Sequence, residues 1–216
     1  MNISDNTLSV LKNFSGINQN LAVKSGNKIR TISPQKTVMA VAQVEDKFDS
    51  AFAIYDLNQF LSAISLFEKP NFVFEDSNVV VANGKSSIRY FYADESMVMS
   101  APERDIELPD TLVEFKLTTD VFKSTMQAAS VLQAPNWSVV GNGSIIEIVV
   151  GDVKNSTSNN YRVTVGATSE EFEVVFKVDN LKMMQRDYNV AVSSKGISHF
   201  TTEKGDLQYF VATETK

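Results

Sequence analysis

The stretch AIYDLNQFLSAISLF, residues 53–67, changes its periodicity near the middle. Up to Tyr55 the pattern is typical of a β-strand, and from Asp56 onward the apolar residues follow the spacing of one helical face. These apolar residues are Leu57, Phe60, Leu61, Ile64 and Phe67. Asp56 is a favourable N-cap, and Gln59 three residues later completes a capping-box pattern. The stretch therefore predicts a strand that leads directly into a capped amphipathic helix.

The same pattern occurs at three other places in the chain. A capped helix is predicted within residues 4–17, a strand followed by a helix within residues 113–132, and a strand followed by a shorter helix within residues 173–184. The predicted helix starts lie near Asp5, Asp56, Thr119 and Asp179. Their spacing of about 50 to 60 residues indicates an internal repeat.

Between the helices, alternating apolar and polar residues predict antiparallel strands, with a hairpin around Ser25–Asn27 and a turn at Asn83-Gly84. The proline-containing segment 100–111 is the best linker candidate. We expect an N-terminal domain of residues 1–107 and a C-terminal domain of residues 108–216, each with two strand–helix repeats. Such strands with few amphipathic helices predict an α+β fold whose helices lie on one face of antiparallel sheets.

Composition excludes several classes of protein. The 216 residues are 43% hydrophobic, which is enough for one or two cores. The absence of cysteine excludes a disulfide framework, a thiolate metal site and a thiol nucleophile. Neither a signal peptide nor an apolar run of roughly 20 residues is present, so we expect a soluble protein of the cytoplasm with no membrane partner. The net charge of −6 argues against tight nonspecific binding of nucleic acid through a basic patch.

The sequence contains no convincing catalytic constellation. Ser9–Lys12, Ser4–Asn6 and Lys24–Gly26 match motifs of penicillin-binding enzymes, but they lie too close together and in the wrong order to build that site. The single histidine, His199, lies in a predicted strand and is more typical of an ordinary strand residue than of a ligand. Acidic residues do not recur at metal-ligand spacing. We therefore predict no enzymatic activity, no cofactor and no metal.

The polar faces of the predicted helices carry amides, hydroxyls and a few basic residues, although the chain as a whole is acidic. Acidic residues on these helices lie mostly at the N-termini, where capping explains them. Solvation explains any single lysine on such a face. The asymmetry across all four helices is more informative and favours a functional surface.

Three segments resemble the sliding clamps of T-even-like tailed bacteriophages, which are DNA polymerase processivity factors: IYDLNQFLSAISL, LKNFSGINQNLAVKSG and NLKMMQRDYNVAV. The resemblance runs in order along nearly the whole chain. It implies a DNA-clamp fold, in which a homotrimeric ring of two-domain subunits has sheets outside and helices lining a hole for duplex DNA. It also implies an ATP-dependent clamp loader, docking of a C-terminal peptide of the replicative DNA polymerase in a hydrophobic pocket, and support of phage late transcription.

The resemblance assigns roles to the polar helix faces. A closed ring holds DNA by topology, and each phosphate contact would add about −0.9 to the log–log salt slope and increase friction, so sparse charge suits sliding. The expected DNA-facing residues are Lys12, Lys123, Lys182, Arg186, Asn58 and Gln59, together with Lys24 and Lys28 on the predicted hairpin. Ser62 and Ser65 complete an uncharged face on the helix that follows Asp56.

The resemblance also implies that edge strands pair between subunits to close the ring, since unpaired edges are otherwise adhesive. We expect these strands at residues 86–92 and around residue 161, with Arg89, Tyr90, Phe91, Tyr161 and Arg162 as subunit contacts. Burial in the core of one subunit explains the aromatic residues equally well. Two other classes of protein remain open: a structural protein that uses a repeated α+β fold without DNA and, disfavoured by the missing catalytic constellation, an enzyme.

Overall fold

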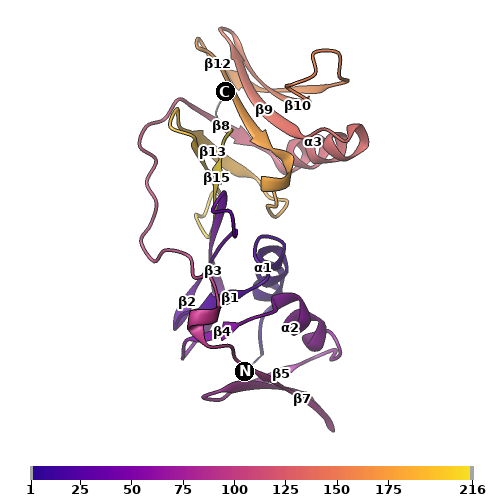
Figure 1. Cartoon of the computed structure of the whole chain (residues 1–216), viewed down its shortest axis with the longest axis vertical. Coiled ribbons are helices and arrows are strands. Elements are labelled where there is room, and N and C mark those ends of the chain that lie inside the picture. The colour runs from indigo at the N-terminus through magenta and orange to yellow at the C-terminus, as the bar shows by residue number, and fades with distance from the viewer. Residues whose placement is uncertain (1, 215–216) are drawn as a thin grey trace. The chain divides into compact units, whose positions relative to one another are not determined.

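The computed structural model describes residues 2–214 (Figure 1). The chain divides into two compact units, Met1–Asp105 and Ile106–Lys216. Both units combine helices with antiparallel strand pairs, so the predicted α+β class is confirmed. In Figure 1 the first unit is coloured indigo to magenta, and the second continues to yellow.

The first unit is built mainly from short antiparallel strands. Its elements are α1 (Asp5–Ser15), β1 (Leu21–Val23), β2 (Gly26–Ile32), β3 (Val38–Phe48), β4 (Phe52–Ile54), α2 (Leu57–Ile64), β5 (Asn71–Phe74), β6 (Asn78–Asn83), β7 (Ser86–Phe91) and the 3₁₀-helix η1 (Glu95–Met97). Strand β1 pairs with β4, β2 pairs with β3, and β6 lies between β5 and β7. Helix α1 packs on β3 and lies beside α2, and Phe14 and Leu57 are completely buried.

Strand β4 leads into α2 as the sequence predicts. Asp56 has an extended backbone (φ −124°, ψ 95°), and its side chain accepts a hydrogen bond of 2.9 Å from the Gln59 N–H. A tyrosine of β7 reinforces this start, because the Tyr90 hydroxyl donates to the Asp56 carbonyl at 3.0 Å and lies 3.4 Å from Gln59 Oε1. The Tyr90 ring also packs edge-on against Phe60 at 5.1 Å. The helix start therefore combines the predicted local cap with a contact from a distant strand.

The predicted hairpin around Ser25–Asn27 is wrong. The two strands that flank it belong to different sheets, since β1 pairs with β4 and β2 pairs with β3. Gly26, with φ +113°, makes the bend between them. The pairing follows from burial, because β1 is only three residues long and places Leu21 and Val23 in the core when it pairs with β4. Lys24 thus lies in a bend, and Lys28 lies within β2.

The second unit places α3 on one of two antiparallel sheets. Its elements are β8 (Val113–Leu117), α3 (Thr119–Leu132), β9 (Asn136–Asn142), β10 (Ile145–Gly151), β11 (Tyr161–Ala167), β12 (Glu171–Lys177), the 3₁₀-helix η2 (Val178–Asn180), β13 (Tyr188–Val192), β14 (Ile197–Thr201) and β15 (Leu207–Ala212). One sheet has the order β11-β10-β9-β12, and the other pairs β8, β13, β14 and β15 in that order. Helix α3 packs on β9, β10 and β11, over a core that includes Trp137 and Phe176.

The predicted fourth helix near Asp179 is wrong. The chain forms only the single turn η2 there, and the segment from there to Asp187 is irregular. Two tyrosine hydroxyls bind the backbone of this segment: the Met184 N–H donates to Tyr209 at 3.2 Å, and Tyr188 donates to the Met184 carbonyl at 2.5 Å. These two contacts, one from a distant strand and one from four residues ahead, satisfy the N–H and the carbonyl of Met184 without helical hydrogen bonds.

Candidate functional site

Each of the three α-helices within residues 2–214 buries one face and exposes a polar face. The exposed residues of these faces are Asp5, Ser9 and Lys12 on α1, Asn58, Gln59 and Ser62 on α2, and Asp120, Lys123, Gln127 and Ser130 on α3. Spacings of three and four residues place each set on one side of its helix. The α2 face carries no charge, and the α1 and α3 faces each carry one lysine and one acidic residue in the first turn.

A carboxylate of β3 fixes the start of α1. Asp46 Oδ2 accepts hydrogen bonds from the backbone N–H and the hydroxyl of Ser4, both at 2.8 Å, and Ser4 in turn caps the Thr7 N–H. Partial burial raises the pKa of Asp46, but hydrogen bonds involving Thr7 and Ser4 outweigh it and leave the pKa below its ordinary value. The polar face of α1 is therefore held in a fixed orientation on the sheet.

A second carboxylate fixes the start of α3. Asp187 Oδ1 accepts hydrogen bonds from the backbone N–H and the hydroxyl of Thr119, both at 2.7 Å. These bonds hold the pKa of Asp187 below its ordinary value. Inside the helix the buried Thr125 hydroxyl donates to the Phe122 carbonyl at 2.9 Å. The sequence reading identified neither Asp46 nor Asp187, because their partners lie far away in the chain.

Lys12 lies at a groove between the two helices of the first unit. The groove has a volume of about 320 Å³, and its apolar lining includes Leu8, Leu61, Ile64 and Phe67. A lysine stem can pack along such apolar surface while its ammonium group stays in water. The α1 and α2 faces are thus adjacent and share this lysine at their boundary.

Lys182 and Arg186 occupy a different kind of position from the one predicted. Both are exposed, but they lie in the irregular segment after η2 and not on a helical face. Their spacing of four residues therefore has no helical meaning here. The positions of Lys182 and Arg186 depend on the backbone conformation of this segment, which Tyr188 and Tyr209 hold through hydrogen bonds to Met184.

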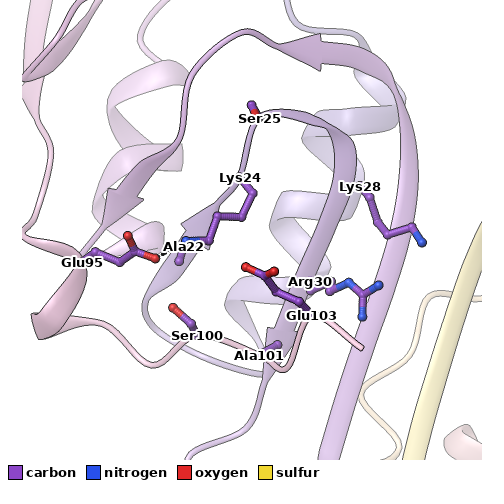
Figure 2. A pocket seen from close by; sticks show the side chains of 9 residues that line it. All are labelled: Ala22, Lys24, Ser25, Lys28, Arg30, Glu95, Ser100, Ala101 and Glu103. Atoms are coloured by element: carbon purple, nitrogen blue, oxygen red, sulfur yellow. Dashed lines mark hydrogen bonds and ion pairs between the residues drawn. The ribbon is translucent and has the colours of Figure 1, made fainter. Parts of the chain in front are cut away.

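Lys24 and Lys28 are paired with carboxylates of the first unit. Lys24 forms an ion pair with Glu95, which raises the pKa of Lys24, and Lys28 Nζ lies 3.8 Å from Asp105 Oδ1. Both lysines line a cavity to which neither α1 nor α2 contributes a residue (Figure 2). The structure therefore does not bring these two lysines onto the helix faces.

Strand β7 forms an edge of its sheet within the described part of the chain, since β6 is its only strand partner there. The Tyr92 N–H donates to the Ser77 carbonyl at 3.0 Å, on the β6 side of the strand. Backbone groups alternate in direction along a strand, so those of Arg89 and Phe91 point to the open edge. Phe91 is 65% exposed. The Tyr90 side chain lies on the opposite face of the strand from Phe91 and contacts α2, so it packs within its own unit.

Strand β11 forms an edge of the second unit's four-stranded sheet among the described residues. Tyr161 is half-buried opposite Val150, and Arg162 is exposed. Arg162 Nη1 lies 3.4 Å from Glu147 Oε2 on the neighbouring strand. Each unit therefore offers one edge strand that carries an aromatic residue and an arginine.

Residues 2–214 contain no group of three or more His, Cys, Asp or Glu side chains that could hold a metal ion. His199 stacks on Phe210 at 4.4 Å and pairs with Gln208 at 3.0 Å, and burial lowers its pKa. Within the same range, no helix is both long and apolar enough to cross a membrane.

Comparisons with known proteins agree along the whole chain. The model of the family described as DNA polymerase processivity factor matches residues 4–100, and that of the gp45 sliding clamp, C-terminal, matches residues 115–215. The sliding clamp of Vibrio phage KVP40 is 32% identical, over 99% of each chain. The sliding clamp of Enterobacteria phage T4 is 30% identical, over 99% of this chain and 97% of the relative.

Solved structures show the same fold at much lower identity. The PCNA of A. fulgidus, bound to the C-terminal region of FEN-1, superposes with a TM-score of 0.72 at 14% identity, over 97% of this chain and 95% of that one. The PCNA2–PCNA3 complex of Sulfolobus tokodaii gives a TM-score of 0.70 at 13% identity, over 100% of this chain and 98% of that one. The predicted clamp fold is therefore confirmed.

Proposed function

This chain belongs to the sliding clamps, the family of DNA polymerase processivity factors, and from that premise we propose that it forms a homotrimeric ring around duplex DNA. The ring tethers the replicative DNA polymerase and gives processive synthesis. An ATP-dependent loader opens and closes it, so the clamp itself catalyses no reaction and uses no cofactor or metal. It works in the cytoplasm of the host bacterium.

The observation that carries this proposal is the low charge of the helix faces. In a chain of net charge −6, the α2 face is uncharged and the α1 and α3 faces each carry a single lysine. Low charge suits a surface that surrounds DNA and slides along it, because it limits the number of phosphate contacts. Each such contact adds about −0.9 to the log–log salt slope of binding. In the proposed ring, the residues that face the DNA are Lys12, Asn58, Gln59 and Lys123. Lys182 and Arg186, in the segment after η2, lie near the DNA as well.

Ring closure follows from the two edge strands. In our proposal β7 of one subunit pairs with β11 of the next, so that both edges are covered and neither is left to aggregate. Arg89 and Phe91 contribute from β7, and Tyr161 and Arg162 contribute from β11. Tyr90 acts indirectly, since it holds β7 against α2.

Partner proteins dock on the outside of the ring as short peptides. The A. fulgidus structure, in which the C-terminal region of FEN-1 is bound to PCNA, is a precedent for such binding in this fold. We place the C-terminal peptide of the replicative polymerase in this role. The resemblance to phage clamps extends the proposal to proteins of late transcription.

Processive synthesis tests the proposal directly. The protein is added to its cognate polymerase, the clamp loader and ATP on circular primed DNA, and we expect much longer products per binding event. The matched control is the same template cut once near the primer, because a ring that is held only by topology slides off a free end. Equal product lengths with and without the protein on circular DNA would contradict the proposal.

A further inference from the structure

The end of the first unit is fastened to β2 by one arginine. Arg30 Nη1 donates to the carbonyls of Pro102 and Arg104, both at 3.1 Å, and Nη2 donates to Asp105 Oδ1 at 2.7 Å. The Arg30 side chain is only 14% exposed, whereas Asp105 is 76% exposed. The rigid guanidinium fork thus binds three acceptors of one short segment, residues 100–105, which we call the strap.

Few other contacts hold the strap. The chain is anchored just before it, where Val98 is buried and the Met99 N–H donates to Asn20 Oδ1 at 3.0 Å. Within the strap, Ala101 is half-buried and the other five residues are exposed. The remaining ion pair, Lys28 with Asp105, is solvated on both sides, and salt screens such pairs strongly. Arg30 is therefore the main fastener of the strap.

The strap covers a cationic cavity. The cavity has a volume of about 380 Å³, and its lining includes Lys24, Lys28 and Arg30 from the β1–β2 region and Glu103 from the strap (Figure 2). Glu95 of η1 already pairs with Lys24. In the structure the Asp105 carboxylate pairs with Lys28 and Arg30, and the carbonyls of Pro102 and Arg104 accept hydrogen bonds from Arg30. When the strap opens, the same two cations have no anion from it.

We propose that the strap is an autoinhibitory contact, in which Asp105 and two carbonyls occupy Arg30 until the phosphate groups of a polyanion displace them. Arg30 gives the Asp105 carboxylate one hydrogen bond and two backbone carbonyls the others, and the same N–H donors can bind phosphate oxygens, which accept from guanidinium as carboxylates do. Lys28 adds a second positive charge at the same cavity. The ligand is defined by its phosphate chemistry, which DNA backbone and free polyphosphate share.

Trypsin cleavage after Arg104 measures opening of the strap, with cleavage after the exposed loop residue Lys154 as an internal reference. We expect Arg30→Gln to raise cleavage at Arg104 about tenfold relative to the reference, because bonds to a charged donor shift local opening by roughly that factor. Asp105→Asn leaves the half-buried Arg30 in place, and because residue 105 directly follows the cleaved bond, its effect is compared with that of the same change in an unfolded peptide of residues 98–112. We expect cleavage of the folded variant to rise beyond the change seen in the peptide. Lys47→Gln, on exposed β3 surface, is the matched control and leaves cleavage unchanged.

The ligand is tested with sodium tripolyphosphate and with a DNA duplex, each against sodium chloride of equal ionic strength. We expect at least one phosphate probe to accelerate cleavage at Arg104 in the native chain beyond the chloride control, with no further acceleration in Arg30→Gln. Acceleration by tripolyphosphate assigns the site to free phosphates, and acceleration by the duplex alone assigns it to DNA backbone. The proposal fails if Arg30→Gln or Asp105→Asn is cleaved at the native rate, or if chloride matches both probes.

Discussion

Asp46 shows how one carboxylate sets the position of the polar face of α1. It lies on β3, yet it accepts hydrogen bonds from both the N–H and the hydroxyl of Ser4, the residue that caps α1. The ionised form makes these bonds, which is why the pKa of Asp46 lies below its ordinary value despite partial burial. The orientation of Lys12, farther along α1, therefore depends on a charge located on another element.

Replacing Asp46 with Asn is expected to lower the free energy of unfolding by about 1 kcal/mol at pH 7, because the hydrogen bonds lose their ionic partner. A carboxyl whose pKa is lowered in the native state stabilises it above the unfolded pKa, near 4, and this contribution is lost as the pH falls through the native value. Urea titrations at pH 7 and pH 3 should therefore show a difference between native and variant chains that shrinks in acid. Asp49→Asn, at an exposed loop, is the control, and a difference independent of pH would contradict the assignment.

At the scale of elements, α2 could be read from the sequence because its signals are local. Asp56 caps the helix as the sequence predicts, and the buried residues Leu57, Phe60 and Ile64 follow helical spacing. The failed predictions depend on contacts with other strands, which helical or strand periodicity does not reveal. The hairpin around Ser25–Asn27 is replaced because β1 pairs with β4, and the fourth helix is replaced because tyrosines from β13 and β15 bind its backbone.

The candidate site divides in the same way. Sequence periodicity found the exposed face of α2 and the exposed lysines of α1 and α3, because periodicity alone decides which side of a helix is polar. It could not find the carboxylates that pair with Lys24 and Lys28, since Glu95 and Asp105 lie more than 70 residues away in the chain. For the same reason it did not identify Arg30 as the fastener of the strap.

Adding charge to the α2 face tests whether its neutrality matters. Asn58→Lys combined with Ser62→Lys should steepen the log–log salt dependence of retention on DNA circles by about 0.9 for each new phosphate contact, and should slow sliding. Retention after loading is measured by gel filtration between low and physiological salt. Gln35→Lys, in the exposed β2–β3 turn, adds charge away from the helices and should leave the slope unchanged. An equal effect of both variants would remove the α2 face from the DNA surface.

At the scale of the whole molecule, the proposed assembly depends on two edges that occur in different units. Neither β7 nor β11 has a second strand partner in the described part of the chain, and the exposed aromatic Phe91 lies at the β7 edge. A net charge of −6 is compatible with enclosing DNA, because charges outside a wall more than about 8 Å thick are screened at physiological salt. In the proposed ring, closure around the DNA takes the place of affinity for it.

Phe91→Asp should dissociate the proposed trimer, because it places a charge where, in our proposal, an apolar side chain packs against the strand of the neighbouring subunit. We expect light scattering to report a trimer mass for the native chain and a monomer mass for the variant at micromolar concentration, with unchanged circular dichroism. Val73→Asp is the matched control, since Val73 is 48% exposed on β5, the strand at the opposite edge of the same sheet. A stable native monomer, or dissociation by both variants, would contradict the proposed interface.

Tyr90 gives the molecule a mechanical linkage between these surfaces. Its backbone lies in edge strand β7, and its hydroxyl grips the Asp56 carbonyl at the first turn of α2. Separation of β7 from the neighbouring subunit of the proposed ring would therefore act on the start of α2 through the Tyr90 hydroxyl. In the proposed ring, opening of the subunit interface and tilting of α2 would therefore be one coupled motion.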